Sequence, residues 1–170
     1  EKEMSQRFTK IVFTVLLVIL VSAGCGGEQS VMPGGSSTFS SVDPTYKDLA
    51  YATNSETQKL DLYIPTSGNG PFPLVIMVHG GGFMFGDKAD GAGLTGVDQL
   101  LAAGYAVASI NYRLSGEAIY PAQIYDAKAA VRFLRANAAR YNLNPDQFGA
   151  WGASAGGNLV SLLGTTYGGD

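Results

Sequence analysis

The sequence predicts an α/β fold built on a mostly parallel sheet. Short apolar runs of strand length alternate with longer segments of helical periodicity along residues 46–165, and this order is typical of parallel sheets with helices on their faces. Two glycine-rich motifs, at 79–83 and 152–156, each follow a predicted strand. Because ligands of such sheets bind at the carboxyl ends of the strands, both motifs fall where a functional site is expected.

Length and composition indicate one globular domain. The chain has 170 residues, of which 46% are apolar and 15% are charged. Single α/β domains commonly reach about 200–250 residues, so we expect the C-terminal part of the fold to be missing. The net charge is −3, and acidic and basic residues are scattered. This pattern excludes the clustered basic face of a nucleic-acid-binding protein.

The first 24 residues read as a signal peptide. A start containing Lys2, Arg7 and Lys10 precedes an apolar run at 11–21, which is of signal-peptide length and shorter than the roughly 20 residues of a membrane-spanning helix. Ser22, Ala23 and Gly24 then lead into Cys25, the only cysteine.

This junction resembles the lipobox of bacterial lipoproteins, which implies that Cys25 is lipidated and becomes the mature N-terminus. An ordinary signal peptide with an incidental cysteine is the alternative. Residues 25–42 are rich in Gly and Ser and are expected to form a flexible tether, which leaves 43–170 as the N-terminal part of the folded domain. The protein is therefore expected to be exported and anchored to a bacterial membrane, or secreted if Cys25 is not lipidated.

The first half of the domain is expected to supply three strands and one helix. Short strands are predicted at 46–52 and 59–64, and in the second of them Leu60, Leu62 and Ile64 alternate with Asp61 and Tyr63, the period of a half-buried strand. A loop at 65–73 precedes a continuous apolar run at 74–78, typical of a strand covered on both faces. A helix is predicted around 94–103.

The second half repeats the pattern. A buried strand is predicted at 105–110 and a short one at 148–151. Between them, residues 122–141 carry apolar side chains at spacings of three and four, which predicts an amphipathic helix. The apolar, small residues at 155–163 predict a helix that packs tightly on the sheet.

The motif at 152–156, Gly-Ala-Ser-Ala-Gly, makes Ser154 a candidate nucleophile. A serine on a sharp turn from strand to helix has a strained backbone and requires small neighbours two residues away. The turn exposes the hydroxyl near the positive end of a helix dipole. A glycine-rich turn without chemistry is the alternative interpretation.

The motif at 79–83, His-Gly-Gly-Gly-Phe, offers backbone N–H groups that no side chain covers, as an oxyanion requires. The alternatives are a flexible loop or a phosphate-binding loop. A phosphate-binding loop would place a lysine and a Ser or Thr at fixed spacing after the glycines, which Gly86-Asp87-Lys88 does not supply.

Further motifs surround these two in a fixed order. They are Gly86, Asn111-Tyr112-Arg113-Leu114, Tyr120-Pro121-Ala122 with Asp126, Asn144-Pro145-Asp146, and 151–159 around the serine. Together they resemble the hormone-sensitive-lipase branch of the α/β-hydrolases and the related bacterial carboxylesterases and feruloyl or acetylxylan esterases. The resemblance implies a three-layer α/β-hydrolase fold, Ser154 as the nucleophile, and an oxyanion hole formed by the N–H groups of Gly81, Gly82 and Ala155.

His79 is the only histidine, but its place inside the glycine motif suggests that, with Gly80, it supports the oxyanion loop. In this fold the catalytic acid and then the histidine follow the serine in sequence, and only 16 residues follow Ser154. We therefore expect both partners beyond residue 170 and expect the 170 residues alone to be nearly inactive.

Other polar or aromatic residues have simpler interpretations. Asp126 is expected to cap a helix or to hold the residues of the site in place rather than to act in catalysis. Asp87 is expected to lie in a turn, Arg113 to anchor an ion pair beneath the loops, and Trp151 to belong to the core. One His and one Cys give no ligand cluster for a metal. Neither a metal nor a cofactor is implied.

The predicted function is hydrolysis of a carboxylic ester through an acyl-enzyme. The expected substrate is a small-molecule or carbohydrate-linked ester, and the membrane is the other expected partner, through Cys25. A serine peptidase of the same fold and a surface lipoprotein that has lost catalysis remain as alternatives.

Overall fold

The computed structural model describes residues 42–90 and 94–166. The predicted signal peptide, Cys25 and all of the predicted tether except Val42 lie outside the described residues. Within them, no helix is both long and apolar enough to cross a membrane.

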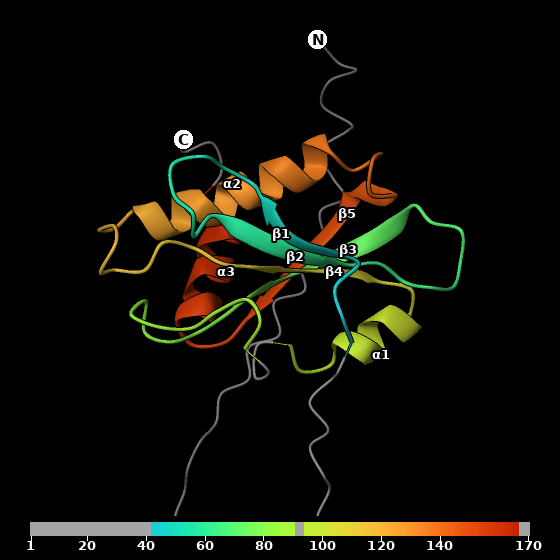
Figure 1. The fold of residues 1–170 in the computed structure, drawn as a ribbon, viewed down its shortest axis with the longest axis horizontal. Helices are drawn as coiled ribbons and strands as arrows, with labels where there is room; N and C mark the ends of the chain where they lie inside the picture. Colours follow the sequence, from blue (N-terminus) through green and yellow to red (C-terminus); the bar gives the residue numbers. More distant parts are fainter. Residues whose placement is uncertain (1–41, 91–93, 167–170) are drawn as a thin grey trace, which may run out of the picture. The chain divides into compact units, whose positions relative to one another are not determined.

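The described part of the chain forms a five-stranded mixed sheet with three helices (Figure 1). In chain order the elements are β1 (Tyr46–Ala50), β2 (Lys59–Tyr63), β3 (Phe72–Val78), α1 (Val97–Ala102), β4 (Ala106–Ile110), α2 (Ala122–Ala136), β5 (Leu143–Gly152) and α3 (Ala155–Thr165). The strand order is β1-β2-β4-β3-β5. β3 pairs in parallel with β4 and β5, whereas β1 and β2 are antiparallel additions at one edge.

The sheet is the middle of three layers. On one face, α2 and α3 pack on side chains such as Leu74, Ile76 and Val78 in the larger core. On the other face, Val97 of α1 packs with Tyr63, Met77 and Val107. In Figure 1, α2 lies on one side of the sheet and α1 on the other. Because neighbouring residues of a strand point to opposite faces, the apolar run of β3 serves both cores.

Every predicted element is present, but several bounds differ. β5 begins at Leu143, five residues before the predicted strand, because Leu143 already pairs with Phe72 of β3. α1 is shorter than predicted, and α2 ends at Ala136 rather than 141. At the end of α2 the Asn137 side chain donates a 2.8 Å hydrogen bond to the carbonyl oxygen of Phe133.

The prediction that the strand at 59–64 is half buried was wrong for Asp61 and Tyr63. Both are buried, at 2% and 3% exposure. Tyr63 lies in the core beneath α1, and the Asp61 carboxylate is paired with the ammonium of Lys88. Alternation with apolar residues did not reveal this because β2 is covered on both faces by partners distant in sequence.

Candidate active site

The two glycine-rich motifs meet because they follow paired strands. The last residue of β3, Val78, is the register partner of Gly152 at the end of β5. The glycine loop therefore begins beside the turn that carries Ser154. A Cβ atom on Gly80 would lie 3.0 Å from the carbonyl oxygen of Ala153 and 3.5 Å from the Ser154 Cβ.

Ser154 occupies a sharp turn between β5 and α3. Its backbone has φ 53° and ψ −119°, a combination that an L-residue adopts at a cost of about 1–3 kcal/mol. The side chain is exposed. Ser154 also stands at the N-cap of α3, where unpaired N–H groups give a positive local potential.

The small residues of this turn allow close packing of backbones. A Cβ atom on Gly152 would lie 2.6 Å from the carbonyl carbon of Gly156 and 2.9 Å from the Val78 oxygen. A Cβ atom on Gly156 would overlap that same Val78 oxygen. Both glycines are therefore required to hold the first turn of α3 against the end of β3.

The glycine loop turns back on itself directly after β3. Gly81 and Gly82 have φ values of 103° and 60°, which favour glycine. The N–H of Met84 donates a 3.0 Å hydrogen bond to the Gly81 carbonyl oxygen and so closes the turn. Among the described residues, no hydrogen bond has the N–H of Gly81, Gly82 or Ala155 as its donor. These N–H groups are available to an oxygen bound beside Ser154.

His79 is held within the glycine loop. It is 4% exposed, its Nδ1 lies 2.8 Å from the Gly80 carbonyl oxygen, and its ring stacks on Tyr112 with centroids 4.4 Å apart. Because a carbonyl oxygen only accepts, the Nδ1 atom carries a proton. Nε2 is buried and has no partner among the described residues. These contacts suit a residue that supports the loop, although that role stays a prediction.

Tyr112 also supports the glycine loop, a role that was not predicted from the sequence. Its buried hydroxyl donates to the carbonyl oxygen of His79 at 3.0 Å and approaches that of Gly80 at 3.3 Å. Burial raises the pKa of this hydroxyl to about 12. Tyr112 therefore stays a neutral donor across the pH range in which most enzymes work. Its place in the Asn111-Tyr112-Arg113-Leu114 motif was the available signal.

Asp126 does not cap a helix, because α2 begins four residues earlier, at Ala122. It holds neighbouring segments of the chain in place. The carboxylate is 1% exposed. It accepts hydrogen bonds from the Arg113 guanidinium at 2.8 and 2.9 Å and from the amide of Gln58 at 2.6 Å. The hydrogen bond to Asp126 raises the pKa of Arg113. The Arg113 anchor thus lies where the sequence predicted it.

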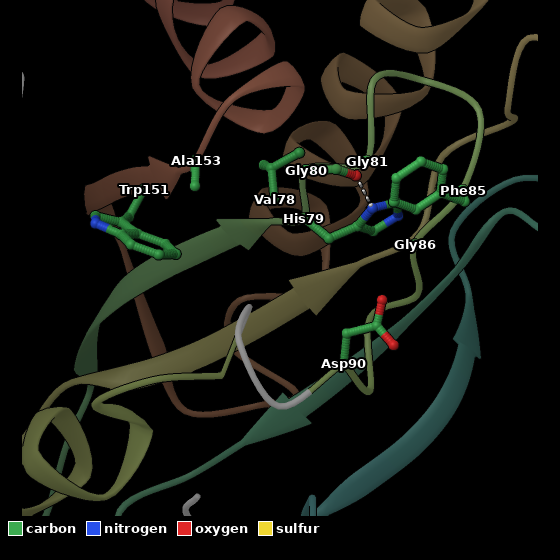
Figure 2. A pocket seen from close by; sticks show the side chains of 9 residues that line it. All are labelled: Val78, His79, Gly80, Gly81, Phe85, Gly86, Asp90, Trp151 and Ala153. Carbon is green, nitrogen blue, oxygen red and sulfur yellow. Dashed lines mark hydrogen bonds between the residues drawn. The ribbon is translucent and has the colours of Figure 1, made fainter. Parts of the chain in front are cut away.

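A pocket of about 250 Å³ lies beside the two motifs (Figure 2). Its lining residues are Val78, His79, Gly80, Gly81, Phe85, Gly86, Asp90, Trp151 and Ala153. Trp151 is 40% exposed, so its assignment to the core was wrong. In Figure 2 the Trp151 ring lies on the β5 side and the Phe85 ring on the opposite side. Asp87, as predicted, lies in a turn, where its carboxylate accepts the Ala89 N–H.

The comparisons with known proteins agree with this arrangement. The BD-FAE family model matches residues 60–169, well over half of the chain. The versiconal hemiacetal acetate esterase of Dothistroma septosporum is 29% identical over 134 residues, which are 78% of this chain and 40% of that protein.

Two solved structures share the fold. One, described as a truncated form of a carbohydrate esterase from gut microbiota, has a TM-score of 0.68 and 38% identity over 79% of this chain and 46% of its own. The other, a bifunctional GH43-CE protein of Bacteroides eggerthii, has a TM-score of 0.68 and 43% identity over 72% of this chain and 16% of its own. The chain spans less than half the length of each of these three proteins.

Proposed function

The chain belongs to the BD-FAE family, within the esterases of the α/β-hydrolase fold, and from this premise we propose that the protein carrying it hydrolyses carboxylic esters with Ser154 as the nucleophile. The contact between Gly80 and the turn at Ala153 and Ser154 carries the proposal. It brings a strained, exposed serine beside backbone N–H groups that have no other acceptor among the residues that the structure describes.

In the proposed first step, the Ser154 Oγ attacks the ester carbonyl carbon as a base removes its proton. The carbonyl oxygen becomes an oxyanion that accepts hydrogen bonds from the N–H groups of Gly81, Gly82 and Ala155. Collapse of this intermediate expels the alcohol, which takes up the proton, and leaves an acyl-enzyme. Water then attacks the acyl carbon in the same geometry and releases the acid.

The base is proposed to come from a part of the protein outside these 170 residues. His79 is the only histidine here, and its Nδ1 is already bound to the Gly80 carbonyl oxygen. A histidine and an acidic partner supplied after the serine would complete the triad in the order usual for this fold.

The proposed substrate is a small-molecule or carbohydrate-linked ester. Two of the structures with the same fold are described as a carbohydrate esterase and a GH43-CE protein. The pocket beside the serine turn supports this class, because the exposed rings of Trp151 and Phe85 present apolar surface to which the apolar face of a sugar or a small acyl group can bind.

The test compares the full-length protein with its Ser154→Ala variant on p-nitrophenyl acetate, an acetylated xylo-oligosaccharide and a prolyl amide. We expect the wild type to cleave the esters and to be labelled by a fluorophosphonate, with both properties lost in the variant. Cleavage of the amide but not the esters would establish a peptidase. A folded wild type that neither turns over the esters nor takes the label would support the non-catalytic lipoprotein.

A further inference from the structure

A buried lysine lies where the glycine loop returns to the sheet. Lys88 is 5% exposed, and its ammonium lies 2.9 Å from the Oδ2 of Asp61 and 2.8 Å from the Oδ1 of Asp48. Burial opposes its charge, but the hydrogen bonds to both carboxylates prevail and raise the pKa of Lys88 above its usual value. The hydrogen bond from Lys88 also lowers the pKa of Asp48. The lysine is therefore a charged cross-link between the loop and the first two strands.

The carboxylates are themselves held in place. The second oxygen of Asp61 accepts the Asp48 N–H at 2.8 Å. Asp48 has φ 55° and lies where the register between β1 and β2 shifts. This irregularity turns the Asp48 backbone toward Asp61 and leaves its side chain for Lys88. The two acids thus form one pre-arranged receptor for an ammonium group.

Other bonds hold the backbone of the same segment to the end of β4. The N–H of Lys88 donates to the Asn111 side-chain oxygen at 2.5 Å, and the Lys88 carbonyl accepts the Ser109 hydroxyl at 2.7 Å. The amide of Asn111 also donates to the Asp87 carboxylate at 2.8 Å. These three hydrogen bonds fix the end of the loop to the sheet.

Gly86 connects this anchor to the oxyanion groups. It lies two residues before Lys88, and its Cα is so close to His79 and Gly80 that a Cβ atom would be 2.9 Å from the Gly80 carbonyl oxygen. A displacement of Lys88 would move Gly86 and, through this contact, the segment that carries the N–H groups of Gly81 and Gly82.

We propose that Lys88, clamped by Asp61 and Asp48, is a positioning residue that holds the glycine loop in the geometry that oxyanion binding needs. This inference rests on the proposed esterase function. Buried ion pairs add little net stability compared with apolar residues of similar volume. Three charged groups in one place beneath the loop are better explained by the fixed position that they impose.

The experiment uses the full-length protein and a variant that combines Asp61→Asn with Lys88→Met. Removing both charges leaves no buried ion without its partner. We expect kcat for p-nitrophenyl acetate to fall roughly 10- to 100-fold, since small displacements of catalytic groups have effects of this size. KM should stay within about threefold, because ground-state contacts are unchanged. The affinity for a trifluoromethyl ketone, whose serine adduct carries an oxyanion, should fall with kcat/KM.

Two further variants keep the test decisive. Asp48 is half exposed, so Asp48→Asn should fold normally, and Asn tolerates the positive φ. We expect this variant to show a smaller fall in kcat with the same unchanged KM. Lys59→Met is the control. Lys59 lies on the same strand as Asp61, but its ammonium pairs with the exposed Glu56. It should retain wild-type kcat.

The proposal is overturned if Asp48→Asn, or a folded Asp61→Asn and Lys88→Met double variant, keeps wild-type kcat and inhibitor affinity. Loss of thermal stability in the double variant, with kcat unchanged at a temperature where it is folded, would also show a purely structural role. An inactive wild type would instead contradict the proposed function, so the two failures are distinguishable.

Discussion

The Cα atom of Gly156, in the first turn of α3, lies against the carbonyl oxygen of Val78 at the end of β3. A Cβ atom on Gly156 would overlap that oxygen and would lie 2.6 Å from the carbonyl oxygen of His79. Both oxygens belong to backbone and cannot rotate away as a side chain could. The position of Ser154 relative to the glycine loop therefore depends on residue 156 being a glycine, which has no side chain.

Gly156→Ala is expected to push α3 away from β3. The overpacking should lower the free energy of unfolding by roughly 1–3 kcal/mol. It should also lower kcat of the full-length protein by at least about 10-fold, because Ser154 immediately precedes the displaced helix. Urea denaturation and ester hydrolysis measured on the same preparation provide the check.

Gly164→Ala is the matched control, since Gly164 lies in the same helix and a Cβ atom there meets nothing within 4 Å. It should leave the free energy of unfolding unchanged or raise it by up to about 1 kcal/mol, because alanine has a higher helix propensity than glycine. Equal effects of the two alanines on kcat would contradict the close packing described for Gly156.

Gly86→Ala is expected to disrupt the glycine loop. Gly86 has φ 115°, and an added Cβ would overlap the Nδ1 of His79. The variant should lose roughly 1–3 kcal/mol of stability from backbone strain. Its kcat should also fall. Gly104→Ala separates the two effects, since Gly104 has φ 83° but no neighbour within 4 Å. That control should be destabilised while its kcat stays at the wild-type value when both are measured well below their melting temperatures.

The order and type of the elements could be predicted because apolar periodicity and the two glycine motifs are local signals. The sequence placed both motifs at the carboxyl ends of strands, but it did not predict that β3 and β5 pair directly, because these two strands are far apart in the chain. The ion cluster of Lys88 could not be predicted in the same way. Its members come from a loop, β2 and the bulged β1, and no spacing rule links them. Trp151 was assigned to the core wrongly because the sequence does not show that α1 leaves this part of β5 uncovered.

Tyr112→Phe is expected to weaken the start of the glycine loop. The change removes the hydroxyl that donates to the carbonyl oxygen of His79 and leaves that oxygen without this partner. A lost buried hydrogen bond of this kind should reduce the free energy of unfolding by about 1–3 kcal/mol at neutral pH. Chemical denaturation at pH 7 measures this difference. A variant as stable as the wild type would contradict the assigned role.

The same tyrosine predicts an alkaline pH dependence. Its folded-state pKa is raised to about 12 by burial, from an ordinary value of 10.0. Above pH 10 the unfolded chain loses this proton while the folded chain keeps it, so stability present below pH 10 is lost as the pH rises toward 12. The stability of the wild type should therefore fall more steeply over this window than that of Tyr112→Phe. Denaturation curves at pH 9, 10 and 11 test the difference in slope.

Cys25 is expected to carry the lipid anchor, although it lies outside the described residues. In a bacterial host fed an alkynyl fatty acid, the full-length protein should take up the label and sediment with membranes. Cys25→Ser should abolish both, whereas Ser30→Ala, five residues further along the predicted tether, should change neither. An unlabelled wild type in the soluble fraction would favour an ordinary signal peptide.

The 170 residues expressed alone are expected to hydrolyse p-nitrophenyl acetate no faster than their own Ser154→Ala variant. The reason is chemical, because an unassisted serine hydroxyl is a weak nucleophile. The only imidazole in the chain is that of His79, which is buried and bound through Nδ1 to Gly80. Circular dichroism would establish that the chain is folded before rates are compared. A rate well above that of Ser154→Ala, lost again on His79→Gln, would mean that His79 acts as the base and that its assignment to the loop must be abandoned.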